Sequence, residues 1–577
     1  MILQALNDYY HRLKNDQDIN IPLLGFSEQK IHFVLLLDRQ GNLLQVLPLG
    51  KKEGKKLTPK LLIVPEPVKR TLGIAPNFMW DNTAYVLGRD KKDKPERAIS
   101  AFNAFKKHHH TLGDELDDEG MKAVLKFLDS WTPENSEKLD HWDEIAGMNV
   151  VFQLDGEMRY IHERPKIHEI WKEYVTEQGS KVFATCLVSG EKSPVARLHP
   201  DIKGIQGAQT KGAALVSFNL NAFLSYGKDQ NFNAPVSEKI AFSYTTALNY
   251  LLSVNSRQKI RIGDTTTVFW TEKTSPIEFF MGHLLNPDEV EQVEDSGQLQ
   301  QIRLFLEAVR DGKHPRDIDH EIKFFILGLS PNAARLSVRF WHVSTVGDVS
   351  AKIGQHYKDL SIEKSYKNDP EFPGVWRLLR ETAAQRKTEN ISPQLIGAMM
   401  RAILTGAAYP QSLLVSVINR LRADQTVNYL RAALIKAHLV RKFRMNNYYP
   451  MEVGMTLNQE ATNVAYRLGR LFAALEKAQM DAVPGAGSTI KDRFYGTASA
   501  SPRIVFPQLI RLAQHHIKKA EYGFMSDKLI EEIMQGIEEF PTHLSLDDQG
   551  LFALGYYHQR RAIFTKTEET TEDKKED

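Results

Sequence analysis

The stretch Ala213-Ala214-Leu215-Val216-Ser217-Phe218 opens the part of the chain that decides the fold. Its continuous apolar run predicts a buried strand. Ser237 predicts the start of a helix, because a serine hydroxyl can accept a hydrogen bond from an unpaired first-turn amide. The pair Gly263-Asp264 predicts a hairpin turn, with Thr265–Trp270 as the return strand. The helix between them is predicted to bury one face, formed by Ile240, Tyr244, Ala247, Leu248, Leu251 and Leu252.

This predicted frame supports loops that are rich in amide, phenol and lysine side chains. Asn219 and Lys228 lie in the first of these loops, ahead of the helix. The loops contain no nucleophile, no acid–base pair and no cluster with metal-ligand spacing. We therefore interpret the stretch from Lys211 to Trp270 as a binding surface rather than a reaction centre.

Composition indicates a multidomain globular protein. The 577 residues are too many for one core and predict two to four domains. A net charge of only +2 gives no general case for nucleic-acid binding, so a basic surface must come from local segregation of charge. The one cysteine, Cys186, cannot form an internal disulfide, which fits a reducing cytosol. The sequence has no signal-peptide pattern and no apolar run that could span a bilayer, so we expect a cytoplasmic protein.

The expected fold class is α+β. Strand and helix patterns mix up to about residue 390, and Ile31–Leu37 with Leu43–Leu47 predicts a hairpin. From Ser392 helical periodicity takes over and continues to about Phe564. We predict a mixed α+β region over residues 1–390, an all-α bundle over 391–564 and a disordered tail over 565–577.

Two N-terminal segments carry candidate nucleic-acid contacts. Asn77 and Asn82 flank Trp80-Asp81, and an exposed asparagine amide can read a base edge through its paired donor and acceptor. The alternative is that such short polar side chains make local turn hydrogen bonds. Four lysines in a glycine-containing loop are phosphate-binding candidates: Lys51, Lys52, Lys55 and Lys56.

A glycine-rich segment, 202–212, is the next candidate. Its glycines would let a backbone approach a ligand closely. Its side chains Lys203, Gln206, Gln209 and Lys211 are of types that contact nucleic acid. A flexible surface loop is the equally plain alternative.

Strict alternation in Arg335–Trp341 predicts a strand with two distinct faces. Arg335, Arg339 and Trp341 would share one face with Ser337, and they would form a platform for phosphate and stacking contacts. An ordinary solvated strand face with a cation–π contact is the alternative.

Basic residues are concentrated in the C-terminal half. Eight Lys or Arg between residues 401 and 450 stand against one acid, Asp424. A solvated bundle surface normally mixes both signs, so this imbalance favours binding to a phosphate backbone. The helix predicted from Arg503 to Lys519 is also basic and lacks acids. The candidates for this phosphate contact are Arg420, Arg422, Arg431, Arg441 and Arg444.

The sequence gives little evidence for a catalytic or metal-binding motif. Adjacent histidines, His108–His110, point in different directions on a helix and lack further ligands at metal-site spacing. Asp155-Gly156-Glu157 and Asp317-Ile318-Asp319-His320 come nearest to a nuclease cluster but match no such motif. We expect a non-catalytic chain with no metal and no cofactor. A metal-dependent nuclease and a protein-only scaffold are the alternatives.

Five stretches of the chain carry a further signal: Pro76–Asn82 with Tyr85–Gly88, Val216–Asn219 with Ser225–Gly227, Asn233–Ser237, Tyr244–Asn249 and Gly328–Arg335. Together they resemble one known family, the large subunit of the type I-C CRISPR Cascade complex, and the resemblance covers the whole chain in order. It implies an N-terminal α+β region that recognises the protospacer-adjacent motif on double-stranded DNA. It also implies a C-terminal bundle like the Cascade small subunit along the displaced strand, which the five candidate arginines of the bundle would hold.

The resemblance also implies the partners. A guide RNA would read most of the target, backbone and guide-capping subunits would complete the complex, and a separate helicase-nuclease would be recruited. A small-subunit copy would start inside the same gene, at Met445, Met451 or Met455. Lys51, Lys52, Lys55, Lys56, Arg335 and Arg339 would grip phosphate. We expect the motif duplex to lie near Asn77, Asn82, Gln206, Gln209, Lys211, Asn219 and Lys228.

Overall fold

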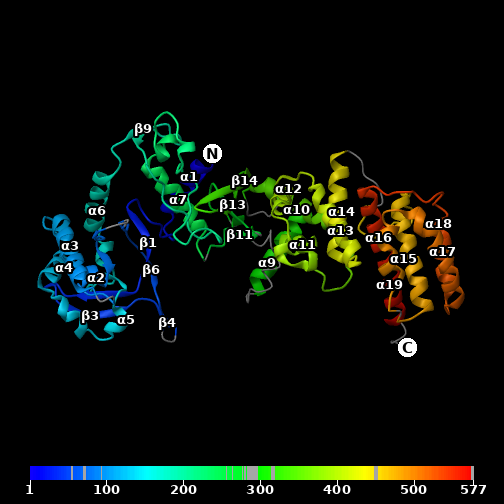
Figure 1. The fold of residues 1–577 in the computed structure, drawn as a ribbon, viewed down its shortest axis with the longest axis horizontal. Coiled ribbons are helices and arrows are strands. Elements are labelled where there is room, and N and C mark those ends of the chain that lie inside the picture. Colours follow the sequence, from blue (N-terminus) through cyan, green and yellow to red (C-terminus); the bar gives the residue numbers. More distant parts are fainter. Residues whose placement is uncertain are drawn as a thin grey trace. The chain divides into compact units, whose positions relative to one another are not determined.

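The computed structural model divides the chain into two compact units, shown as a ribbon in Figure 1. Unit 1 comprises residues 1–201 and 216–250, and unit 2 comprises residues 202–215 and 251–577. The α+β fold class is confirmed. The structure describes residues 1–53, 56–68, 70, 73–91, 94–254, 256–262, 264–275, 277–278, 281, 296–313, 319–446, 453–485 and 487–572.

A four-stranded sheet organises unit 1, in the order β3-β2-β8-β7. The predicted N-terminal hairpin is confirmed, since β2 pairs antiparallel with β3, and β2 also pairs parallel with β8. Helices cover one face of the sheet through a core that includes Leu35, Phe105 and Phe152. The strands are β2 (Phe33–Leu37), β3 (Leu43–Pro48), β7 (Trp80–Asn82) and β8 (Asn149–Leu154), and the covering helices are α3 (Pro95–Gly113) and α4 (Glu119–Ser130).

The other face of this sheet packs on a two-stranded ribbon, β1 (Phe26–Ile31) and β6 (Lys60–Pro65). Trp80 is buried between these layers, and its indole nitrogen donates to the Pro65 carbonyl at 2.8 Å. The remaining elements of unit 1 are α1 (Ile2–Asn15), β4 (Lys51–Glu53), β5 (Lys56–Thr58), α2 (Thr83–Val86), α5 (Trp142–Ile145), α6 (Pro165–Gln178), β9 (Phe183–Thr185), β10 (Lys192–Pro194) and α7 (Glu238–Leu251).

The segment that opens the sequence argument folds mostly as expected. Helix α7 starts after Ser237, whose hydroxyl accepts from the Ile240 amide at 3.3 Å. The expected strand over 213–218 is reduced to isolated bridges at Ala213 and Ala214. The predicted return strand is confirmed, since Ile262 pairs with Thr265; Gly263 lies outside the described residues.

Unit 2 joins an antiparallel sheet to a helical bundle through one continuous hydrophobic core, from Phe269 and Phe340 to Phe472 and Phe552. The strands follow chain order: β11 (Lys259–Ile262), β12 (Thr265–Thr271), β13 (Lys323–Asn332) and β14 (Arg335–Thr345). The helices are α9 (Ser296–Arg310), α10 (Val346–Leu360), α11 (Val375–Arg380), α12 (Pro393–Thr405), α13 (Gln411–Asp424), α14 (Tyr429–Met445), α15 (Val464–Ala482), α16 (Ile490–Ala498), α17 (Pro502–Lys519), α18 (Gly523–Met534) and α19 (Leu546–Glu572).

The sequence analysis places a domain boundary at residue 390, whereas residues 251–577 belong to one structural unit. The hydrophobic core of this unit includes side chains from both sides of residue 390. Helix α19 extends to Glu572, past residue 565 where the sequence predicts a disordered tail; residues 573–577 lie outside the described part. No helix in the described part of the chain is both long and apolar enough to cross a membrane.

Candidate nucleic-acid interface

The turn from Pro76 to Asn82 is built around the buried carboxylate of Asp81. This carboxylate accepts from the Arg70 guanidinium at 3.1 Å and from the backbone amides of Asn77 and Asn82 at 2.9 and 2.8 Å. Burial raises the pKa of Asp81, while the hydrogen bonds from Arg70 oppose that shift. Arg70 also lies over the Tyr85 ring at 4.0 Å. The turn is therefore a rigid, internally bonded element.

Asn77 does not present the exposed amide that the sequence predicts. Its side chain is 3% exposed, and its carbonyl oxygen accepts from the Val68 amide at 3.0 Å. The local turn alternative describes it better. Asn82 caps α2 by accepting from the Ala84 amide at 3.1 Å, and it is half-buried. Asn82 also borders a surface pocket.

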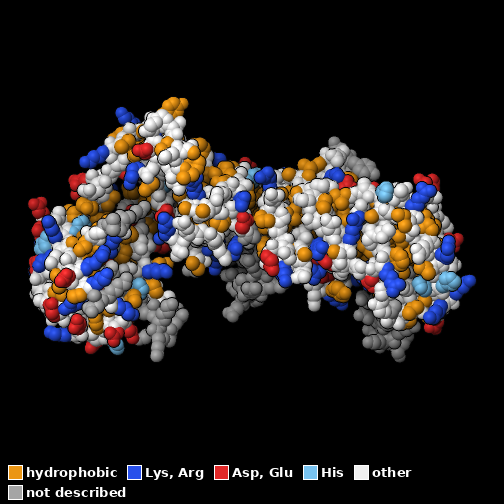
Figure 2. Space-filling model, viewed as in Figure 1, with side chains coloured by type: hydrophobic (Ala, Val, Ile, Leu, Met, Phe, Trp, Pro, Cys, Tyr) orange, Lys and Arg blue, Asp and Glu red, His pale blue; other side chains and the backbone are white. Residues whose placement is uncertain are grey.

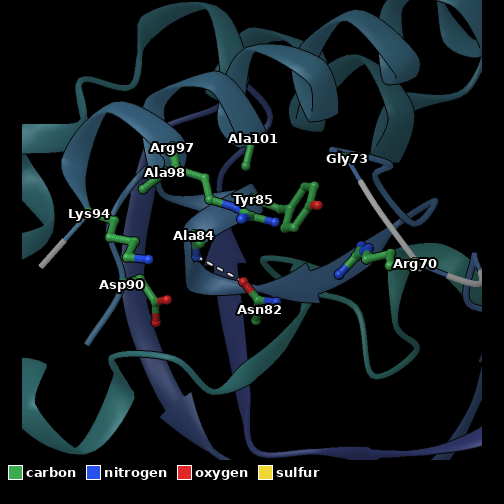
Figure 3. A pocket seen from close by; sticks show the side chains of 10 residues that line it. All are labelled: Arg70, Gly73, Asn82, Ala84, Tyr85, Asp90, Lys94, Arg97, Ala98 and Ala101. Carbon is green, nitrogen blue, oxygen red and sulfur yellow. Dashed lines mark hydrogen bonds between the residues drawn. The ribbon is translucent and has the colours of Figure 1, made fainter. Parts of the chain in front are cut away.

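That pocket has a volume of about 380 Å³ and a basic lining (Figure 3). Lys94 and Arg97 come from the exposed start of α3, and Arg70 lies on the opposite side. Asp90 is the acid among the lining residues. Three cations around one opening suit an anionic group such as phosphate. The full lining is Arg70, Gly73, Asn82, Ala84, Tyr85, Asp90, Lys94, Arg97, Ala98 and Ala101.

The glycine-rich segment 202–212 lies against the chain itself. Gly204 has φ +84°, and a Cβ there would lie 2.5 Å from the Leu252 carbonyl oxygen. Gly207 has φ +84° and approaches Pro331, with a Cβ position 3.2 Å from its ring. The sequence analysis interprets these glycines as a place where a ligand approaches the backbone. In the structure they allow close packing within unit 2 instead.

This packing brings the candidate residues of segment 202–212 close to the sheet of unit 2, which carries Arg335. The Gln206 side-chain oxygen accepts from the Arg261 guanidinium on β11. Ala214 bridges to Arg335 at the start of β14, and the Leu336 amide donates to the Ala214 carbonyl at 3.0 Å. The side chains of Gln209 and Lys211 are exposed on the same segment. We call this group the loop–sheet surface: Gln206, Gln209, Lys211, Arg261 and Arg335.

The prediction that Arg335, Arg339 and Trp341 share one face of β14 is wrong. A bulge shifts the register, so that Leu329 pairs with Val338 while Gly328 pairs with Phe340, and Arg339 is the extra residue. Trp341 then packs against Trp270 and stacks with Phe325, at 5.6 and 5.9 Å between ring centres, on the face opposite Arg335. Arg339 pairs with Asp264 at 3.0 Å.

Two further predicted groups lie in unit 1. Asn219 and Lys228 have exposed side chains in the loop before α7. Lys51, Lys52 and Lys56 belong to the ribbon β4–β5, whose side chains are not described, and Lys55 lies outside the described residues. Asn82, Asn219 and Lys228 thus fall in unit 1, whereas Gln206, Gln209 and Lys211 fall in unit 2.

The arginines of the 401–450 window turn inward. Arg431 is 1% exposed and pairs with Asp424 and, at 3.0 Å, with Glu381. Arg441 is also 1% exposed and pairs with Asp359 at 3.0 Å. Their charges are neutralised inside the protein, so these two are not available to a DNA strand.

The other three arginines of that set are also held by protein groups. Arg420 pairs with Asp424 at 3.3 Å, Arg422 donates to Gln549 at 2.6 Å, and Arg444 pairs with Asp359. The predicted arginine face is therefore largely an internal network.

Helix α17 instead carries exposed basic residues in the described part of the bundle. Arg503, Arg511 and Lys518 are exposed and fall within one stripe, an arc of about 80° around the helix. With a rise of 1.5 Å per residue, the stripe extends for about 22 Å. The helix contains no acid, and Lys, Arg and His side chains gather over this end of the bundle (Figure 2). We call Arg503, Arg511 and Lys518 the α17 stripe.

Lys94, Arg97 and Arg261 were missed by the sequence reading. A signal for the first two was present, since Lys91-Lys92-Asp93-Lys94-Pro95 is a basic run at a helix start. Arg261 also lies in a basic run, Arg257-Gln258-Lys259-Ile260-Arg261. Its contact with Gln206 could not be predicted, because the two residues are distant along the chain.

The model of the family "CRISPR-associated protein (Cas_Csd1)" matches residues 6–564. The chain belongs to this family. The match covers nearly the whole sequence, so both structural units of this Cas_Csd1 protein lie within it. No curated protein matches the chain. The family supports a component of a CRISPR-associated Cascade complex, which is the coarser part of the resemblance seen in the sequence.

Proposed function

We propose that this Cas_Csd1 protein is the non-catalytic large subunit of a type I-C Cascade. In this role it recognises the protospacer-adjacent motif on double-stranded DNA and stabilises the opened duplex while the guide RNA reads the target. Its partners are the guide RNA, the backbone and guide-capping subunits, a small subunit and a recruited helicase-nuclease.

The loop–sheet surface carries the motif-reading part of the proposal. Gln209 supplies an exposed amide, which can donate and accept at a base edge. Lys211 supplies an exposed cation two residues away, suited to a phosphate. Gly204 and Gly207 hold their segment against the protein, so these side chains are presented from a packed backbone. Such support lowers the entropy lost on binding.

Two other basic features extend the DNA path in this proposal. The pocket beside Asn82 offers Lys94 and Arg97 to a phosphate. The α17 stripe takes over the displaced-strand role that the sequence analysis gave to Arg431 and Arg441. Its three exposed cations favour a sugar–phosphate backbone without base choice.

Selection from a motif library by the reconstituted complex tests the motif-reading role. Gln209→Ala is expected to relax motif choice and to cost about 1–3 kcal/mol for the preferred motif. Lys211→Gln is expected to weaken all sequences alike and to flatten the salt slope by about one unit. The exposed Lys107 on α3 provides a matched control, Lys107→Gln, which should change neither. Unchanged selection and affinity in both loop variants would refute this role.

A further inference from the structure

A tight turn in unit 1 holds an aromatic side chain out into solvent. The turn runs from Ser225 to Lys228, and the Lys228 amide donates to the Ser225 carbonyl at 3.0 Å. Its two central residues, Tyr226 and Gly227, both have positive φ, of +52° and +67°. The Tyr226 side chain is 96% exposed. Burial within unit 1 therefore cannot account for a tyrosine at this position.

The backbone of this turn is strained but well held. A left-handed conformation is unfavourable for a residue other than glycine. The Asn233 side chain braces it, accepting from the Ser225 amide at 2.8 Å and donating to the carbonyls of Lys228 and Gln230, both at 2.8 Å. One half-buried side-chain amide thus holds both ends of the turn. The braced turn therefore fixes the backbone from which the Tyr226 ring projects.

We propose that Tyr226 is a stacking residue for an unpaired nucleobase, with Lys228 beside it for the adjacent phosphate. This inference rests on the proposed function, which brings an opened duplex to the protein. A phenol ring offers a flat face that accepts any base, and rigid presentation avoids an ordering cost. Lys228 is exposed and adds a cation within the same turn, a pairing that fits nucleic acid better than a purely apolar partner.

The test uses the complete reconstituted complex and target DNA with 2-aminopurine at successive positions next to the motif, in either strand. Stacking quenches 2-aminopurine, so the unaltered complex should show a quenched position that brightens with Tyr226→Ala and stays quenched with Tyr226→Phe. Affinity for the target should fall roughly 5- to 150-fold with Tyr226→Ala. Asn233→Ala, which keeps the ring but removes the brace, should give a partial loss of quenching.

A second exposed tyrosine, Tyr366, is 76% exposed in unit 2 and serves as a matched control in Tyr366→Ala, which should leave the quenching unchanged. Equal fluorescence at every position in the Tyr226→Ala and unaltered complexes would overturn the inference alone, provided that motif-dependent binding persists. Loss of other subunits from the Tyr226→Ala complex, seen by native mass spectrometry, would overturn it in favour of a protein contact. Absence of motif-dependent binding by the unaltered complex would overturn the proposed function and this inference together.

Discussion

The Asp359 carboxylate on α10 accepts from the Arg441 guanidinium on α14 at 3.0 Å, and each side chain is 1% exposed. Arg441 also donates to the Ala402 carbonyl at 2.8 Å and lies over the Tyr409 ring at 4.1 Å. Lys436 donates to the backbone carbonyl of Asp359 at 3.0 Å. A basic run in the sequence has therefore become a buried polar joint between helices.

Removing one member of this joint should destabilise unit 2. Arg441→Met would leave the Asp359 charge buried with less compensation, and breaking a buried pair costs about 3–5 kcal/mol. Arg420→Met is the comparison, because Arg420 pairs with the partly exposed Asp424 and such pairs contribute about 0–1 kcal/mol. Denaturant unfolding of the purified chain measures both. Equal stability losses in the two variants would contradict the internal role of Arg441.

The α17 stripe should control the affinity of the complex for single-stranded DNA. Replacing Arg503, Arg511 and Lys518 together by glutamine removes three exposed cations. The slope of log affinity against log salt should flatten by about two units, because each neutralised phosphate contributes about 0.7 on a single strand. Binding of the displaced-strand sequence at several salt concentrations provides the measurement. An unchanged slope would remove α17 from the DNA path.

Unit 1 should lose stability in mild acid. Burial lowers the pKa of His109 and His162 to about 3, and that of His199 to about 4. Unfolded histidines have a pKa near 6.5, so the unfolded chain takes up more protons as pH falls below that value. The stabilisation is thus complete above about pH 6.5 and is lost progressively towards pH 4.

Unfolding free energies at pH 7.5 and 5.5 check this expectation, and each such histidine should account for about 1.4 kcal/mol of lost stability in total over this interval. His109→Gln should show a shallower pH dependence, whereas His515→Gln, at an exposed position on α17, should keep it. A pH-independent stability over this range would contradict the buried neutral state.

An internal start should yield a folded C-terminal fragment. Met445 ends α14, Met455 precedes α15, and Met451 lies outside the described residues. A product from Met455 would retain α15 through α19, including the buried Tyr466–His558 contact at 2.8 Å. Expression of the gene alone, followed by intact-mass measurement, checks for it. Replacing the methionine that serves as the start should abolish the fragment. Full-length protein without any such fragment, from the unaltered gene, would contradict the internal start.

Local signals in the sequence predicted much of the fold. The hairpin β2–β3, the helix after Ser237 and the return strand from Thr265 follow from turn residues and short-range periodicity, which act between neighbours. The α17 helix and its basic character were visible for the same reason. Such features require no knowledge of distant contacts.

The missed features depend on partners distant along the chain. The count of eight bases against one acid between residues 401 and 450 ignored Asp359, Glu381 and Asp547, which lie outside that window and pair with Arg441, Arg431 and Lys442. The β14 bulge likewise depends on its fit to β13, and strict alternation in the sequence gave no hint of it.

Site-specific photocrosslinking within the target-bound complex tests the central claim most directly. A photoreactive amino acid at position 209 should crosslink to the motif duplex, and one at position 511 should crosslink to the displaced strand but not to the motif duplex. One at position 107 serves as the control that crosslinks to neither. Crosslinks to DNA from neither 209 nor 511, in a complex that still binds its target, would contradict the account.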